Sequence, residues 1–400
     1  MPVLSPGERA ACPVCETTLE RTRGTGIAAA AALAVTTTVL MIPAIAMPLY
    51  RVELLAGSRS SRVVSGANLF WEQGWPLPAI AMLLFIAVLP LLRFGLLSAV
   101  LLALHFDRRW RGIGAAFRVA QTLAVWAMPE VMLLGIVVAY GRLVAMFDLQ
   151  IGAGAYFMGA ATVAALICRA MIDDRAIWRA IAPGNAAPDG PALSCQACAL
   201  VLPVACDGST CPRCNARLTP RTANSLMVTT ALVLGGTIFY LPANLLPMAQ
   251  TIQMVDAGSY TVLGGVIEFV EAHLVGLALL VFVASFVIPL LKLAGMVWLL
   301  WSVHKGSTRA LKFKTKLHHV IHEIGRWSMV DVLAIGTFVP LMQFDQLAHA
   351  RAMPGMTAFL GVVILTMFAT HTFDTRLMWD ARRRTDAERF ANVSQGIVTA

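Results

Sequence analysis

Long apolar runs separated by short polar segments dominate the chain. A helix needs about 20 largely apolar residues to cross a bilayer, and eight stretches approach or exceed that length with few charges. Charged residues make up 13% of the chain, about half the usual fraction in soluble proteins. The pattern predicts an all-α polytopic membrane protein with eight transmembrane helices, near residues 26–48, 76–104, 118–147, 152–172, 224–246, 271–303, 326–348 and 353–373.

The basic residues alternate between the polar segments and predict an orientation. Lysine and arginine gather in residues 1–25, 105–117, 173–223, 304–325 and 374–400. The remaining loops hold few of them, with Arg51, Arg59 and Arg62 as exceptions. Under the positive-inside rule, both termini and the middle segment face the cytoplasm. This distribution accounts for the net charge of +9 without a nucleic-acid partner.

The two halves of the chain repeat each other at an offset of 199 residues. Cys12-Pro13-x-Cys15 matches Cys211-Pro212-x-Cys214, and Pro90-Leu91-Leu92 matches Pro289-Leu290-Leu291. Each half holds four spans, an even number, so the copies are parallel repeats with the same orientation. We expect an N-terminal cytoplasmic segment with half a zinc ribbon, a first four-helix repeat, a zinc ribbon, a second four-helix repeat and a basic tail, at 1–25, 26–180, 181–223, 224–380 and 381–400.

Four cysteines between the halves have the spacing of a small cytoplasmic zinc ribbon. Two Cys-x-x-Cys pairs a dozen residues apart supply four thiolates for a tetrahedral ion, which suits zinc and also permits iron. The predicted ligands are Cys195, Cys198, Cys211 and Cys214. A single pair, Cys12 and Cys15, forms the partial N-terminal copy, and the sequence leaves its metal binding open. Cys206 fits neither pair, and Cys168 lies in an apolar run as a packing residue.

Polar residues inside the predicted spans are the candidates for function, because ionisable groups are costly there. Pro289 has no N–H, so the carbonyl of Ser285 loses its helical partner. Lys292 lies two turns after Ser285 on the same helix face. We expect Asp331 to be its buried partner, with a locally capped carboxylate as the alternative. Thr366 lies at similar depth and completes the cluster, unless its hydroxyl bonds only to its own helix.

The first copy differs at the matching positions. It has Ile86, Arg93, Glu130 and Ala165, so it retains opposite charges but loses both hydroxyls. The second half is therefore expected to carry any site that handles protons or substrate.

Histidines contribute little to the sequence-based prediction. The cluster His318-His319-x-x-His322 has helical spacing in a basic cytoplasmic segment, so a solvated face is expected rather than a metal site. A haem-binding bundle would need paired histidines at one depth, and the predicted topology puts His273 and His371 at opposite faces of the membrane.

Several motifs together resemble the paraquat-inducible protein A family. Besides the ribbon, they are "LPANLLPM" (241–248), "SFVIPLLKLAG" (285–295), "GRWSMVDVL" (325–333) and "TFDTRLMWD" (372–380). The resemblance runs from residue 12 to about residue 380 in two copies, and the second copy matches better. It implies a protein of the bacterial inner membrane that works with a periplasmic protein of MCE (mammalian cell entry) domains, a hexameric tunnel for lipids.

The resulting prediction is a non-enzymatic component of intermembrane phospholipid transport. It would pass lipid to or from the tunnel protein, and protonation of Asp331 would supply any coupling to a proton gradient. Two alternatives remain open from the sequence. One is a redox or stress-response membrane protein, and the other is an anchor that holds the tunnel protein without transporting anything.

Overall fold

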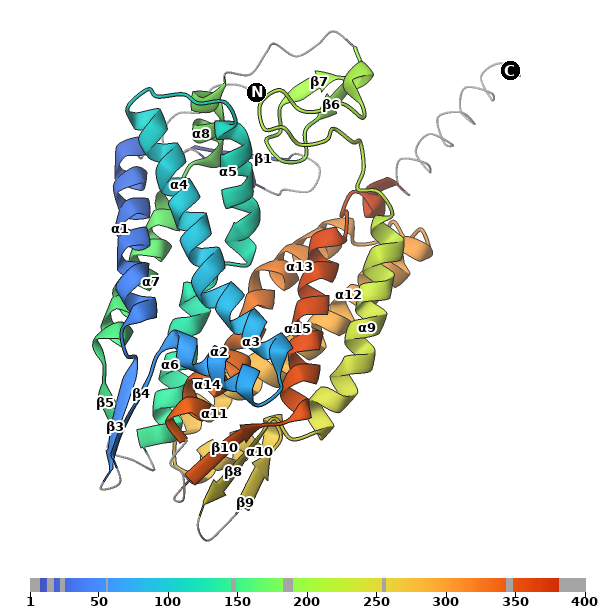
Figure 1. The fold of residues 1–400 in the computed structure, drawn as a ribbon. Coiled ribbons are helices and arrows are strands. Elements are labelled where there is room, and N and C mark those ends of the chain that lie inside the picture. Colours follow the sequence, from blue (N-terminus) through green and yellow to red (C-terminus); the bar gives the residue numbers. More distant parts are fainter. Residues whose placement is uncertain are drawn as a thin grey trace.

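A computed structural model describes residues 8–12, 18–21, 26–54, 57–144, 149–182, 190–253, 257–342 and 348–380. These residues are mainly helical (Figure 1). Among them, seven helical stretches are long and apolar enough to cross a membrane: Ile27–Ala46, Pro76–His105, Ile113–Gly141, Ala153–Met171, Ser225–Leu245, Val275–His304 and Pro354–Thr372. They confirm seven of the eight predicted spans.

The first repeat begins with a membrane-length helix and ends with a short amphipathic one. Its elements are α1 (Ile27–Ala46), β3 (Tyr50–Leu54), β4 (Gly57–Ser61), α2 (Val63–Glu72), α3 (Pro76–Leu83), the π-helical turn η1 (Leu84–Val88), α4 (Leu89–His105), α5 (Ile113–Thr122), η2 (Leu123–Val125), α6 (Pro129–Val144), β5 (Leu149–Ile151), α7 (Ala153–Met171) and α8 (Asp174–Ile181).

The second repeat follows nearly the same order. Its elements are α9 (Ser225–Leu245), β8 (Ala249–Gln253), β9 (Ala257–Tyr260), α10 (Val262–Glu271), α11 (Val275–Phe282), the π-helical turn η4 (Val283–Val287), α12 (Ile288–His304), α13 (Leu311–Ile324), η5 (Gly325–Met329), α14 (Val330–Phe338), η6 (Val339–Met342), β10 (Ala348–Ala352) and α15 (Pro354–Thr372). The helices α10, α11 and α12 begin 199 residues after α2, α3 and α4, the offset found in the sequence.

The predicted span 326–348 is not one of the seven long helices. Its described part consists of two 3-10 turns around the nine-residue helix α14, and residues 343–347 lie outside the described residues. Pro340 contributes to this interruption because it cannot donate a helical hydrogen bond. Instead of standing apart, α14 packs against α6 of the first repeat.

The loops predicted as plain connections contain β-sheet, so the all-α prediction was wrong there. Each repeat has a three-stranded antiparallel sheet, with the strand orders β4-β3-β5 and β9-β8-β10. In both sheets the central strand follows the first helix, and a strand from just before the last helix pairs with it. Both sheets lie at the same end of the bundle, which we call the sheet end (Figure 1).

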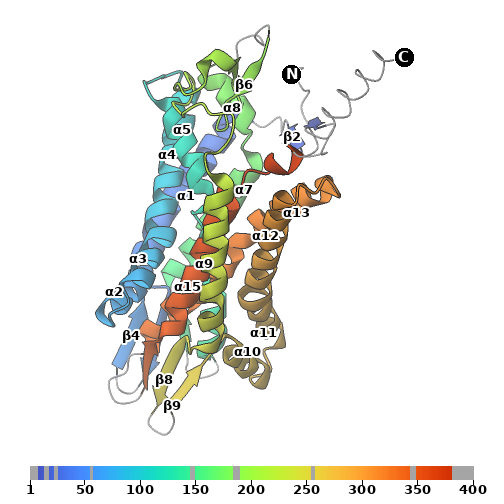
Figure 2. The same ribbon diagram turned by 90° about the vertical axis from the view of Figure 1, so that its right-hand side faces the viewer.

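The opposite end carries a small module of residues 190–223, and we call it the ribbon end (Figures 1 and 2). The module contains the strands β6 (Ala192–Ser194) and β7 (Val201–Pro203) and the 3-10 turn η3 (Val204–Cys206). A second hairpin, β1 (Arg9–Ala11) and β2 (Thr18–Arg21), belongs to the N-terminal segment. Its Cys12 is described, whereas Cys15 lies outside the described residues, so the partial N-terminal ribbon stays a prediction.

The two repeats share one hydrophobic core. Residues of α6 and α14, such as Val131 and Val332, are fully buried in the same cluster. Backbones of the two repeats touch where α2 meets α14, because a Cβ atom on Gly66 would lie 2.0 Å from the carbonyl oxygen of Gly336. Only glycine permits this approach. The repeats are therefore halves of one packed body.

Candidate functional site

The predicted ribbon cysteines form a compact, buried group. The Sγ atoms of Cys195, Cys198, Cys211 and Cys214 all lie within 4.8 Å of one another. The pairs Cys195–Cys214 and Cys198–Cys211 are each 3.6 Å apart. A Zn–S bond of about 2.3 Å sets tetrahedral sulfurs about 3.8 Å apart. The four thiols therefore fit a tetrahedral metal ion, and Cys206 lies outside the group, as predicted.

The two Cys-x-x-Cys pairs lie in two backbone turns of the same kind. The N–H of Ala199 bonds to the carbonyl of Cys195, and the N–H of Asn215 bonds to that of Cys211. Both residues after the pairs have left-handed backbones, with φ of 53° at Ala199 and 58° at Asn215. A hydrogen bond from the Cys198 thiol, aided by backbone N–H groups, lowers the pKa of Cys195, whereas the same bond and burial raise the pKa of Cys198. Binding of a metal ion by the group would therefore displace thiol protons.

The ribbon packs onto the first repeat. Cys195 and Cys214 share a hydrophobic cluster with Phe117 of α5 and Trp178 of α8. The approach is close, since a Cβ atom on Gly114 of α5 would lie 1.9 Å from the carbonyl oxygen of Arg213. A stable ribbon thus forms a lid over the ends of two first-repeat helices.

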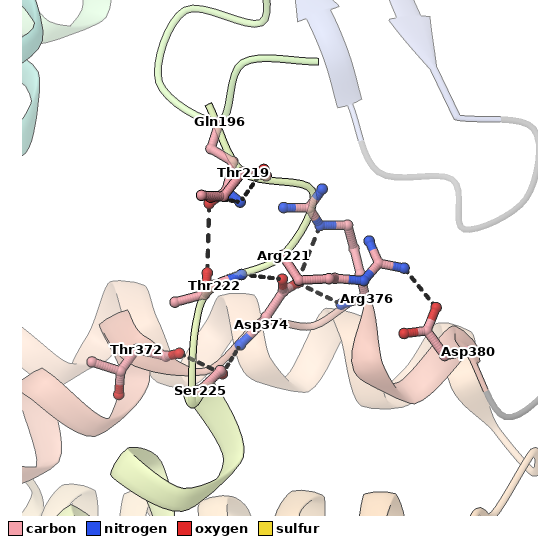
Figure 3. Close-up of polar contacts among 9 residues, drawn as sticks. All are labelled: Gln196, Thr219, Arg221, Thr222, Ser225, Thr372, Asp374, Arg376 and Asp380. Carbon is pink, nitrogen blue, oxygen red and sulfur yellow. Dashed lines mark hydrogen bonds and ion pairs between the residues drawn. The ribbon is translucent and has the colours of Figure 1, made fainter. Parts of the chain in front are cut away.

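Polar contacts join the other side of the ribbon to the second repeat (Figure 3). Ser225, at the start of α9, donates to the carbonyl of Thr372 at 2.6 Å and accepts from the N–H of Asp374 at 2.8 Å. The carboxylate of Asp374 accepts from the N–H of Thr222 at 3.4 Å. Arg221 and Asp380 form an ion pair at 2.6 Å. The ribbon therefore bridges both repeats at one end of the bundle.

The buried cation predicted in the second repeat is present. Lys292 in α12 is 2% exposed, although it lies in a 30-residue apolar stretch. Its Nζ donates to the carbonyl of Gly325 at 3.2 Å and to the hydroxyl of Ser328 at 3.5 Å. Ser328 in turn donates to the Gly325 carbonyl at 2.7 Å. The lysine thus bonds to η5, the joint between α13 and α14.

Two other predicted members of this polar cluster, Thr366 and Ser285, are buried as well, but none of their described hydrogen bonds goes to Lys292. Thr366 in α15 is 1% exposed, and its hydroxyl donates to the carbonyl of Val362 in its own helix at 2.8 Å. Ser285 is fully buried, and its hydroxyl has no hydrogen-bond partner among the described residues. Asp331 lies in α14, but its side chain is outside what the structure describes, so its pairing with Lys292 stays a prediction.

The helix does not break at Pro289 but passes through a π-helical turn before it. The N–H of Ile288 bonds to the carbonyl of Val283, five residues earlier. The same turn occurs in the first repeat, where the N–H of Leu89 bonds to the carbonyl of Leu84. Such turns insert one extra residue into a helix and often occur at functional sites.

The first repeat places different polar groups at the corresponding depth. Arg93, the counterpart of Lys292, is 8% exposed and lies over the Phe94 ring at 4.7 Å. Arg169 approaches Glu130 at 3.7 Å and Glu323 of the second repeat at 3.2 Å. Arg93 and Arg169 line a pocket of about 490 Å³ between the repeats. Among the described contacts, the first repeat thus offers an arginine that reaches carboxylates of both repeats, and the second offers a buried lysine that bonds to a carbonyl and a hydroxyl.

The expectation of a solvated histidine face was wrong for one residue. His318 of α13 is only 7% exposed, whereas its neighbour His319 is exposed. The residues that bury His318, such as Phe373 with its ring 5.4 Å away, lie more than fifty positions further along. Nothing in the local spacing indicates this contact. Cys168, in contrast, is fully buried as predicted.

Fold and site together define a class: a multi-pass helical membrane protein made of a duplicated unit, with a cysteine metal module between the copies. Within that class the chain belongs to a specific family. The family model for paraquat-inducible protein A matches residues 27–182 and 226–383, one match on each repeat.

Individual relatives agree with this assignment. The chain is 30% identical to the "Intermembrane transport protein PqiA" of Escherichia coli (strain K12), over 97% of this chain and 94% of that protein. It is 26% identical to the "Lipophilic envelope-spanning tunnel protein A" of the same organism, over 97% and 90%. A "Probable intermembrane transport protein" of Haemophilus influenzae is 33% identical over 42% of this chain and 41% of its own. No solved structure matches the chain.

Proposed function

We propose that this protein is the inner-membrane component of a system that moves phospholipid between membranes. Relatives that cover nearly the whole chain carry the names "Intermembrane transport protein PqiA" and "Lipophilic envelope-spanning tunnel protein A". On this proposal the protein passes lipid to or from a periplasmic tunnel of MCE domains. Both termini and the ribbon face the cytoplasm, segment 326–348 completes eight spans in two parallel repeats, and zinc occupies the ribbon.

The observation that carries the proposal is the buried Lys292. A lysine at the centre of a transmembrane helix costs about 2.5–3.5 kcal/mol on insertion scales, and such residues mark transport pathways and relays. Lys292 bonds to Gly325 and Ser328, where α13 turns into α14. A change in its charge or hydrogen bonding would alter how these two helices join, which would bias a two-state bundle.

Proton coupling is a further part of the proposal. Asp331 follows Ser328 by three residues, so its side chain would titrate near the same joint. Ser285 in η4 supplies a buried hydroxyl on the same long helix as Lys292, and Thr366 in α15 supplies one that bonds to its own helix. Lys292, Asp331 and Ser285 would form a relay that opens and closes the lipid path, with Thr366 beside it.

A direct test removes the charge of Lys292 without creating a large cavity. Lys292→Met removes a buried cation while preserving most of the volume, so the fold should remain as stable or become more stable. In a host that lacks its own copy, we expect this variant to reach normal abundance and yet lose the outer-membrane barrier, measured as growth on detergent. Asp331→Asn should behave in the same way, and Arg93→Met is the matched first-repeat control.

The outcomes separate the three functions. A normal barrier in both Lys292→Met and Asp331→Asn would contradict a role of the cluster in transport and favour the anchor. A visible chromophore in the purified protein would favour the redox alternative. Loss of the barrier in Arg93→Met alone would place the pathway in the first repeat.

A further inference from the structure

Three histidines from two helices meet at the ribbon end of the second repeat. His318 and His322 lie one turn apart on α13, with ring centroids 6.5 Å apart. His371 comes from the end of α15, and its ring lies 4.8 Å from that of His322. All three line an open pocket of about 530 Å³ between α13, α15 and the ribbon.

The most buried of these rings has an unsatisfied nitrogen. His318 is 7% exposed, and its Nε2 lies 3.1 Å from the carbonyl oxygen of Thr370. Since a carbonyl only accepts, Nε2 carries the proton and Nδ1 presents a lone pair. Nδ1 is buried and has no hydrogen-bond partner among the described residues. Leaving a buried polar atom unpaired is costly, so a ligand is expected here.

This arrangement is the usual one for a metal-binding histidine. Such a residue commonly donates its second ring N–H to a backbone carbonyl or carboxylate, which fixes the tautomer and the ring orientation. Burial lowers the pKa of His318 to about 4, so the ring is neutral at pH 7. Metal ions bind only the neutral form.

The other two rings are oriented by neighbours as well. His371 stacks on Trp126 of the first repeat, with a centroid distance of 6.1 Å and an angle of 17° between the rings. Nδ1 of His322 lies 3.9 Å from the carboxylate of Glu323. Both rings line the pocket that His318 also lines.

We propose that His318, His322 and His371 bind a divalent transition-metal ion at a site separate from the cysteine ribbon. Imidazole ligands suit zinc, copper and nickel, and three histidines leave an open fourth position for water or another ligand. With a metal–nitrogen bond of about 2.0–2.1 Å, two coordinating rings lie about 5 Å apart at their centroids. The observed distances of 4.8 and 6.5 Å lie on either side of this value.

Closing the site requires only side-chain rotation. Among the described histidine, cysteine and acidic side chains, the cysteine set is the group whose ligand atoms already lie within 4.8 Å of one another. His322 is half-buried and His371 is exposed, so both rings have room to turn toward Nδ1 of His318. A bound ion would fix α13 to α15. Because α13 runs directly into Gly325, it would also fix the carbonyl that accepts from Lys292.

The test is zinc binding to the full-length protein, purified through a tag without histidine. After weak chelation that leaves the ribbon metal in place, calorimetry with zinc chloride should detect one further equivalent. We expect His371→Gln and His318→Phe each to weaken this binding at least tenfold, since even outer-shell changes cost 10–100-fold. His304→Gln, an exposed histidine at the end of α12 that does not line this pocket, is the matched control and should bind as the wild type does.

Cobalt distinguishes the two sites spectroscopically. Cobalt in the ribbon gives sulfur-to-metal charge-transfer bands, whereas cobalt on three histidines gives only weaker ligand-field bands, which His371→Gln should remove. The absence of a second equivalent in the wild type would overturn the proposal. Unchanged binding by His371→Gln would overturn it too, and this exposed position avoids the folding risk of His318→Phe.

Discussion

The two repeats have nearly the same succession of helices and strands but differ in how the described charged residues are placed. In the first repeat, the half-exposed Arg169 approaches Glu130 at 3.7 Å and Glu323 of the second repeat at 3.2 Å. In the second, the buried Lys292 bonds to a carbonyl and a hydroxyl of η5, where α13 meets α14. A buried cation at such a joint couples its own state to the way the two helices meet. The comparison suggests a scaffold in one copy and a movable part in the other.

The ribbon end shows the same contrast. Phe117 of α5 packs edge-on against Trp178, 4.8 Å away, inside the apolar cluster that holds the ribbon cysteines. The offset between the repeats grows from 199 to 201 residues after α4 and α12, so its counterpart in α13 is His318, which instead faces a pocket with three other histidines. Duplication thus allowed one copy to become an apolar support while the other kept polar groups at the matching place.

Loss of the ribbon should have the largest effect and should damage the first repeat most. Structural zinc contributes about 10–16 kcal/mol in zinc-finger peptides, so Cys211→Ser should abolish ribbon metal and strongly reduce folded protein. Mass spectrometry should show the loss of the ribbon metal. Hydrogen exchange should show that α5 and α8 lose protection before α13. Cys206→Ser is the control and should change neither. An equal loss of hydrogen-exchange protection in both repeats would contradict the role of the first repeat as the scaffold.

Disturbing the close backbone contact between the repeats, where Gly66 meets Gly336, should have the next largest effect on stability. Gly66→Ala places a methyl group against the Gly336 carbonyl, and we expect a loss of about 3 kcal/mol in unfolding free energy. Gly95→Ala in α4 is matched in chemistry but has open space around its Cβ position. It should stabilise the helix by up to about 1 kcal/mol. Thermal unfolding in detergent would compare the two, and similar shifts would show that the repeats do not depend on this contact.

Exchanging the two buried cations should give the smallest effect and the finest comparison. Lys292→Arg adds volume at a fully buried position and should cost about 1–3 kcal/mol. Arg93→Lys keeps the charge but weakens the contact with the Phe94 ring, worth about 0.5–1 kcal/mol. Unfolding midpoints of both variants would measure the difference. A larger loss of stability from Arg93→Lys than from Lys292→Arg would show that Arg93, and not Lys292, is the more constrained cation.

Length and spacing made part of this molecule predictable. Seven spans follow from apolar length alone, and the ribbon follows from four cysteines whose chemistry requires their spacing. The duplication is visible because prolines such as Pro90 and Pro289 mark equivalent places in both copies. These features depend on local sequence, so one sequence suffices to find them.

Other features depend on residues far apart in the chain. The strands β3 and β8 are short and lie in polar loops, and each pairs with a strand about a hundred residues later. His318 is buried by α15, which its own neighbours cannot indicate. Pro289 was expected to break the helix, but the helix continues through it as α12, and the irregularity is a π-helical turn just before it.

The π-helical turns η1 and η4 determine which way the second half of each long helix faces. Each turn contains one residue more than an α-helix would need, and one residue corresponds to a rotation of about 100°. Removing one residue between Val283 and Val287 would turn Lys292 away from Gly325 without changing any residue near it. The orientation of the buried cation is therefore encoded by a single inserted residue about two turns upstream, and the corresponding insertion in η1 sets the direction of Arg93.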